Sequence, residues 1–252
     1  MPLLDKAGAQ FPKLKIFLRK DFLILISILF LLLFFWGGIE LRNVFMVDRA
    51  QQFDEWLLVS VRDAENPQYL FGPHWVDEAV RDVTALGGPA VLTFMIIGVI
   101  VYLLLKKSYR SAGLVFVATL GGLIISLLLK EFFLRPRPDI VPALMVETSP
   151  SFPSGHSMLS AVVYLTIGSL LARLETNPRI RVYTISIATL IAAMIGITRI
   201  LLGVHYPTDV LVGWIVGFFW ASLCWFVMVI LQEQKMVESN LEFDEEEAPE
   251  PA

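Results

Sequence analysis

The sequence has long stretches without any charged residue, and it has a single cysteine. Because Cys224 is alone, an intramolecular disulfide is excluded as a support for the fold. Charged residues make up 17% of the chain and hydrophobic residues 56%, and the mean hydropathy is +0.67. This balance lies on the apolar side of the globular average. It favours a protein embedded in lipid over one or two soluble domains.

Six runs lack Asp, Glu, Lys and Arg, and each is about long enough to cross a hydrocarbon core of roughly 30 Å. They span residues 22–39, 83–105, 111–129, 157–172, 182–198 and 210–231. We therefore predict an all-α, polytopic membrane protein with six transmembrane helices, forming one domain at residues 1–231. No small-residue cleavage site follows the first run, so we expect an uncleaved anchor.

Two segments stand outside these runs. Residues 41–82 mix Trp, Tyr and Phe with charge, which is typical of a helical segment lying in the headgroup layer. His74 lies in this segment, and we expect it to be an interface anchor. Residues 232–252 hold eight of the 24 acids, from which we expect a disordered, solvated tail.

The distribution of basic residues predicts the orientation of the chain. Six spans place both termini on one side of the membrane, and 12 of the 20 Lys and Arg residues fall on that side. Since basic residues are enriched in cytoplasmic segments, we expect both termini in the cytoplasm. For a bacterial inner membrane protein, the opposite ends of the spans would face the periplasm or exterior.

Three polar motifs lie at these outer ends, where hydrophobicity alone would not require them. They are KEFFLRPRP at residues 130–138, PSGH at 153–156 and TRILLGVHYPTD at 198–209. The predicted topology brings all three to one side of the membrane. The cations Lys130, Arg137 and Arg199 there indicate an anion site, and phosphate is the anion that they suit best.

The remaining motif residues indicate catalysis at that site. Two histidines can divide the roles of nucleophile and general acid in a double displacement. Asp209 lies four residues after His205 and can hold the tautomer of that imidazole, which makes His205 the nucleophile and His156 the acid. Ser154, Gly155 and the helix start after them can also contact a phosphate oxygen. The sequence allows two roles for Arg135, contact with lipid headgroups or contact with the substrate.

Together these motifs resemble the three-part signature of the type 2 phosphatidic acid phosphatase superfamily, with Thr198 at a position where that family usually has serine. The resemblance implies an all-helical core and metal-independent hydrolysis of lipid phosphates, without a cofactor. Bacterial relatives act on undecaprenyl diphosphate, phosphatidylglycerophosphate, phosphatidic acid or lipid A phosphates. We expect a lipid phosphatase of this kind, with a lipid phosphate and membrane lipids as partners and no nucleic acid.

Three alternatives use similar residues. A phosphotransferase would pass the phosphate to another lipid through the same site. A transporter would bind a lipid phosphate without cleaving it, but pure binding gains nothing from the negative charge of Asp209. A vanadate-dependent haloperoxidase shares the anion-site pattern, but those enzymes are soluble. Metal ligation by His156, His205 and Asp209 is disfavoured, since the neighbouring cations would repel a divalent ion.

Overall fold

The computed structural model describes residues 48–246, with side chains from residue 50 to Val229. All regular secondary structure in this part of the chain is helical, with no strand beyond an isolated bridge between Arg62 and Leu70. The all-helical prediction is therefore confirmed for residues 48–246. Of the six predicted spans, the first, at 22–39, lies outside the described residues.

Four helices are long and apolar enough to cross a membrane. They are α6 (Tyr109–Phe133), α7 (Gly155–Leu174), α8 (Pro178–Leu201) and the Pro207–Val229 part of α9 (Pro207–Glu246). Helices α4 (Trp75–Ala85) and α5 (Pro89–Leu105) make a fifth span if they count as one, with a bend of 41° between them. The count of six spans stays a prediction. The boundary between a membrane domain and a tail at residue 231 also stays a prediction, and α9 runs across it to Glu246.

Local sequence explains where these helices begin and end. Helix α6 stops before Pro136, because a residue that precedes proline is disfavoured in helical conformation, and Leu134 adopts a left-handed φ of 46°. Asn177 caps α8 by accepting a hydrogen bond from the Arg179 amide at 2.9 Å. Proline opens both α8 and α9, where its missing N–H is not needed.

Helix α9 packs closely on its neighbours through glycine and tryptophan. A Cβ added at Gly217 would lie 2.4 Å from the Met158 carbonyl oxygen, so only glycine allows α9 to approach α7 so closely. The Trp220 indole N–H donates to the Ala118 carbonyl of α6 at 2.8 Å, and the Trp214 indole donates to Ala192 of α8 at 3.0 Å. These contacts fix α9 against three helices.

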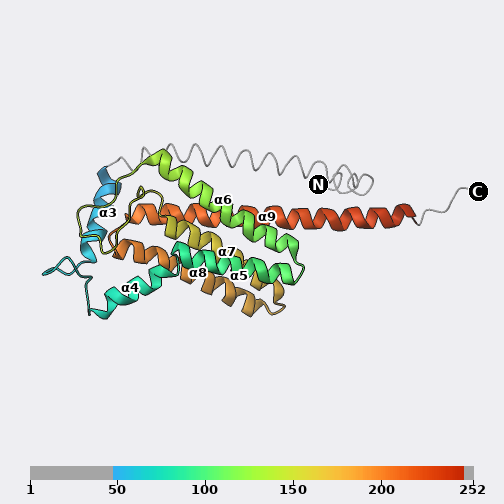
Figure 1. Cartoon of the computed structure of the whole chain (residues 1–252), viewed down its shortest axis with the longest axis horizontal. Helices are drawn as coiled ribbons and strands as arrows, with labels where there is room; N and C mark the ends of the chain where they lie inside the picture. Colours follow the sequence, from blue (N-terminus) through green and yellow to red (C-terminus); the bar gives the residue numbers. More distant parts are fainter. Residues whose placement is uncertain (1–47, 247–252) are drawn as a thin grey trace, which may run out of the picture. The chain divides into compact units, whose positions relative to one another are not determined.

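The loops that carry the three motifs lie at one end of the helices (Figure 1). Helix α3 (Asp48–Ser60) and helix α4 lie at the same end. Leu58 of α3 packs with Val141 and Tyr206, which belong to the loops after α6 and α8. This end therefore has its own core, which holds the motif loops together.

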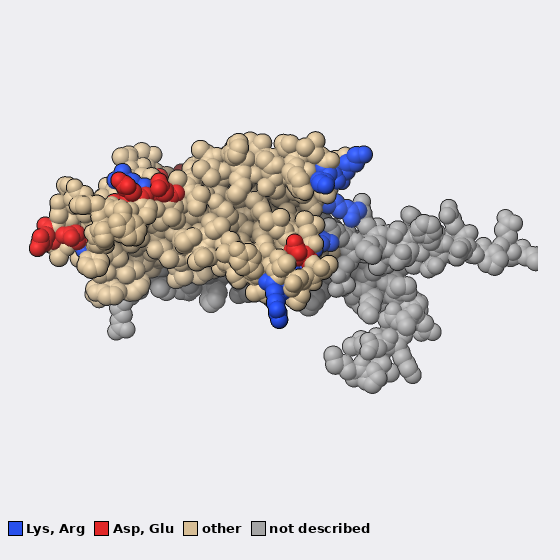
Figure 2. All heavy atoms as spheres, turned by 90° about the horizontal axis from the view of Figure 1, so that it is seen from below, with Lys and Arg blue, Asp and Glu red and all other residues tan. Residues whose placement is uncertain are grey.

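The surface between the two ends of the helices is apolar. On the face shown in Figure 2, charged side chains gather toward the two ends, and a band between them has none. Exposed hydrophobic side chains are numerous along α5 to α9, among them Phe94, Phe116 and Phe218. Such a band suits a hydrocarbon core, so the described helices are those of an integral membrane protein.

Candidate active site

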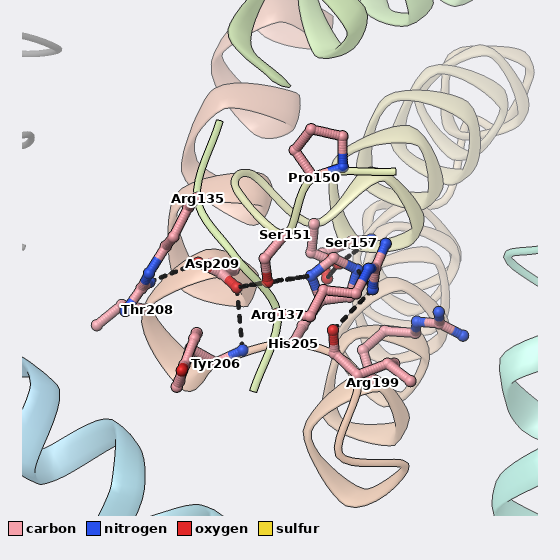
Figure 3. Close-up of polar contacts among 12 residues, drawn as sticks. Arg135, Arg137, Pro150, Ser151, Ser157, Arg199, His205, Tyr206, Thr208 and Asp209 are labelled. Carbon is pink, nitrogen blue, oxygen red and sulfur yellow. Dashed lines mark hydrogen bonds and ion pairs between the residues drawn. The ribbon is translucent and has the colours of Figure 1, made fainter. Parts of the chain in front are cut away.

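The three motifs meet through contacts between the loops on which they lie. The Ser154 amide, at the start of α7, donates to the Asp209 carbonyl in the first turn of α9 at 3.1 Å. The Ser151 amide donates to the Arg135 carbonyl at 2.9 Å, which joins the two ends of the loop between α6 and α7. Backbone hydrogen bonds thus set the positions from which the side chains converge (Figure 3).

Asp209 is fully buried and is surrounded by donors. Its Oδ1 accepts from Arg135 at 2.6 Å, and its Oδ2 accepts from the Tyr206 amide at 3.0 Å and from the Ser151 hydroxyl. A buried carboxylate is tolerated when it is paired and hydrogen-bonded in this way. The contacts hold both oxygens of Asp209 in fixed directions.

Arg135 connects Asp209 to a second buried carboxylate, Asp54 of α3. The Asp54–Arg135 distance is 2.9 Å, and Asp54 also accepts from the amide and the hydroxyl of Thr208 at 3.0 and 2.6 Å. Although burial lowers the pKa of Arg135, the two aspartates raise it above its ordinary value. Arg135 is therefore bound within the protein by two aspartates, and its contact with headgroups or with substrate stays a prediction.

His205 lies between Asp209 and Arg137. Its Nδ1 is 3.3 Å from the Ser151 hydroxyl and 3.6 Å from Asp209 Oδ2, and its Nε2 is 3.3 Å from the Arg137 guanidinium. Burial lowers the pKa of His205 to about 4, although Asp209 opposes this shift. The imidazole is therefore neutral at pH 7, and one ring nitrogen keeps a free electron pair.

Arg137 and Arg199 share a carboxylate, that of Glu147 in the loop between α6 and α7. Glu147 is bound directly by Arg199 and lies 3.6 Å from Arg137. Burial raises the pKa of Glu147, but the two arginines bring it below its ordinary value, so the side chain is ionised. The carboxylate occupies the kind of position that an anionic ligand would take between two guanidinium groups.

Lys130 and the start of α7 lie beside these arginines. The Lys130 ammonium donates to the Pro150 carbonyl and to the Ser149 hydroxyl, which also accepts from Arg137 at 3.2 Å. Gly155 lies next to the aliphatic part of the Lys130 side chain, because a Cβ added at Gly155 would be 3.7 Å from Lys130 Cε. The Ser154 hydroxyl is buried and accepts from the amide and the hydroxyl of Ser157, at 3.4 and 2.8 Å, so it caps α7.

His156 lies in the first turn of α7. Arg199, Glu147 and His205 are all near enough to act on it electrostatically. Its ring lies against the turn between α4 and α5, where a Cβ on Gly87 would come within 3.4 Å of its Cδ2. The fold thus brings His156 of α7 and His205 of the loop after α8 near enough to interact electrostatically.

Four residues at the site escaped prediction from the sequence. Asp54 lies in the segment predicted to be interfacial, and no motif marks it. Ser151, Ser149 and Glu147 lie between the first two motifs, in a stretch that reads as a loop. Only Ser151 could have been suspected from the sequence, because its hydroxyl lies two residues before PSGH. Its role becomes visible only through its contacts with His205 and Asp209 of the third motif.

The chain is similar to several known proteins. The sequence profile described as the PAP2 superfamily matches residues 110–232. Phosphatidylglycerophosphatase B of Bacillus subtilis is 38% identical over 149 residues, which are 57% of this chain and 70% of that protein. An undecaprenyl-diphosphatase of Sulfolobus acidocaldarius is 28% identical over 124 residues, and this chain spans about half its length, 54%.

Solved structures show the same fold. The crystal structure of a transmembrane PAP2-type phosphatidylglycerolphosphate phosphatase from Bacillus subtilis matches with a TM-score of 0.66 at 29% identity, over 79% of this chain and 94% of that one. LpxE of Aquifex aeolicus matches with a TM-score of 0.51 at 26% identity, over 68% and 91% of the two chains. Both matches extend well beyond the three motifs.

Proposed function

This chain belongs to the PAP2 superfamily of lipid phosphatases, and we propose that it hydrolyses a lipid phosphate or diphosphate through a phosphohistidine intermediate on His205. The relatives named above favour phosphatidylglycerophosphate and undecaprenyl diphosphate as substrates. The motif resemblance adds phosphatidic acid as a third. The reaction takes place at the periplasmic or outer face of the membrane, with both termini in the cytoplasm. The lipid tail stays in the bilayer throughout.

One observation carries this proposal: an anion already lies between Arg137 and Arg199, beside a neutral imidazole. The carboxylate of Glu147 pairs with both guanidinium groups, and the Nε2 of His205 is 3.3 Å from one of them. A phosphate held in the same way would have its phosphorus next to a nitrogen with a free electron pair. Positioning of this kind supplies much of the acceleration in phosphoryl transfer.

The reaction then has two steps. Nε2 of His205 forms a bond to phosphorus as the P–O bond to the lipid breaks, and His156 gives a proton to the departing oxygen. Water next attacks the phosphohistidine, His156 accepts a proton from that water, and inorganic phosphate leaves. Arg137, Arg199 and Lys130 stabilise the charge on the transferred group, together with Ser154 and Gly155 at the start of α7.

Phosphate release in detergent with EDTA tests the proposal. Phosphatidylglycerophosphate, undecaprenyl diphosphate and phosphatidic acid are compared for the wild type, His205→Ala and His74→Ala. His74 is a matched control, since it is exposed and its ring stacks edge-on against Tyr69 far along the chain from the motifs. We expect activity that survives EDTA and is lost only in His205→Ala.

Two other outcomes would redirect the proposal. If His205→Ala keeps the wild-type rate, the phosphohistidine intermediate is refuted. If the lipid loses its phosphate without release of inorganic phosphate, and a second lipid gains it, the protein is a phosphotransferase. Both enzymes would use the same residues, so only analysis of the products separates them.

A further inference from the structure

Ser151 is a fully buried serine that bridges the two catalytic groups of the third motif. Its hydroxyl donates to Asp209 Oδ2 and lies 3.3 Å from His205 Nδ1. The direct separation of Nδ1 and Oδ2 is 3.6 Å, which exceeds the usual length of an N–H···O hydrogen bond. In Figure 3 the serine side chain stands between the imidazole and the carboxylate.

The contacts of His205 determine which ring nitrogen carries the proton. Nε2 faces the Arg137 guanidinium, which has N–H groups to donate and no acceptor. Nε2 must therefore be the acceptor in this contact, and it carries an electron pair and no proton. The ring is neutral at pH 7, since burial lowers the pKa of His205 to about 4, so its one proton is on Nδ1.

The numbers of donors and acceptors also determine the direction of the two hydrogen bonds of Ser151. A hydroxyl has one hydrogen and two electron pairs, whereas an ionised carboxylate can only accept. The Ser151 hydrogen therefore goes to Asp209, and its oxygen is left to accept the Nδ1–H of His205. The three groups form a chain in which each donor has one acceptor, running from His205 through Ser151 to Asp209.

We propose that Ser151 is a positioning residue that carries the link between Asp209 and His205 and so keeps Nε2 free to attack phosphorus. Attack on phosphorus makes the imidazole cationic, and both hydrogen bonds of the chain then strengthen because one partner is charged. Nδ1 keeps its proton throughout. The inference rests on the proposed function in one respect, namely that Nε2 is the attacking atom.

The tautomer can be read directly from nitrogen NMR shifts of ¹⁵N-histidine-labelled protein in micelles. The chain has three histidines, so the spectrum contains three imidazoles, and single replacements of His74 and His205 assign them. We expect the His205 signals of an Nδ1–H ring with a bare Nε2. A wild-type spectrum with the proton on Nε2 overturns the inference without any serine variant.

Ser151→Ala tests the role of the hydroxyl in catalysis. We expect kcat to fall about 10- to 100-fold, the loss of a hydrogen bond to a charged partner, with KM within about threefold of wild type. The His205 signals should shift toward a mixture of both tautomers. Ser151→Thr, which restores a hydroxyl, should recover part of kcat and return the spectrum toward Nδ1–H.

Ser160→Ala is the matched control, because Ser160 is an equally buried serine of α7 whose hydroxyl donates to a backbone carbonyl. It should keep the wild-type kcat and spectrum. An unchanged kcat in Ser151→Ala, or a lowered kcat with unchanged His205 signals, overturns the proposal. If His205→Ala remains active, the proposed mechanism fails. The tautomer measurement on the wild type still tests whether Ser151 links His205 to Asp209.

Discussion

Replacement of Glu147 by glutamine should make the protein bind phosphate more tightly. The Glu147 carboxylate is bound directly by Arg199 and lies 3.6 Å from Arg137, so an incoming phosphate has to displace it. Glutamine keeps the shape of the side chain but removes its charge. The two guanidinium groups then lose an internal competitor for the substrate.

The structure sets the size of this effect. A hydrogen bond between charged groups contributes about 1.5–3 kcal/mol, and the Glu147 side chain is 23% exposed, so solvent screens part of that energy. Screening reduces the competition to about 1–2 kcal/mol. Since about 1.4 kcal/mol corresponds to tenfold in binding, we expect the inhibition constant of inorganic phosphate to fall about 5- to 30-fold.

The assay is competitive inhibition by phosphate of the hydrolysis of a short-chain lipid phosphate, with KM measured in the same series. KM should fall in parallel with the inhibition constant, and kcat should not rise, because tighter phosphate leaves more slowly. Glu131→Gln is the control, as Glu131 is an exposed carboxylate in the last turn of α6. An unchanged or weaker phosphate affinity in Glu147→Gln, or an equal shift in Glu131→Gln, would refute the reasoning.

Three further perturbations follow from the described contacts. Asp54→Asn breaks a buried ion pair, so we expect a loss of about 3–5 kcal/mol in unfolding free energy and a lower kcat, measured by denaturation in detergent and by initial rates. Gly217→Ala should lower the thermal midpoint, since its Cβ would meet the Met158 carbonyl, whereas Gly98→Ala meets nothing within 4 Å and should not. The pKa of His205 is near 6.5 in the unfolded chain and about 4 in the folded protein. The unfolding free energy should therefore fall as pH drops through that window, with a shallower slope in His205→Gln than in the wild type.

Much of the helical fold can be predicted from the sequence because membrane spans leave a strong, local signal. The charge-free runs at 111–129, 157–172, 182–198 and 210–231 each lie within one helix of the structure. The run at 83–105 was harder, because Gly87 and Gly88 interrupt it and the structure bends there by 41°. Hydropathy averages over such a break, whereas the bend depends on backbone conformation.

The candidate site was predictable only where its residues stand in compact motifs. Unexpected polarity at the end of an apolar run is visible in one sequence, and it led to the prediction of Lys130, Arg137, Arg199 and the two histidines. Asp54 could not be found in this way, since its partner Thr208 is 154 residues away. A buried aspartate and an exposed one look the same in the sequence of a helix such as α3, and only the tertiary contact separates them.

The basic side chains at the site also fall into two groups that the sequence does not separate. Arg135 and Arg137 are two residues apart, but Arg135 is bound by carboxylates on α3 and α9, and Arg137 faces Glu147 on a loop. A guanidinium held by two buried aspartates has its charge balanced within the fold, which suits a structural role. A guanidinium whose carboxylate lies on a loop can exchange it for phosphate without breaking a helix contact. We therefore expect an anion to enter and leave the site beside Arg137 and Arg199, which both pair with Glu147.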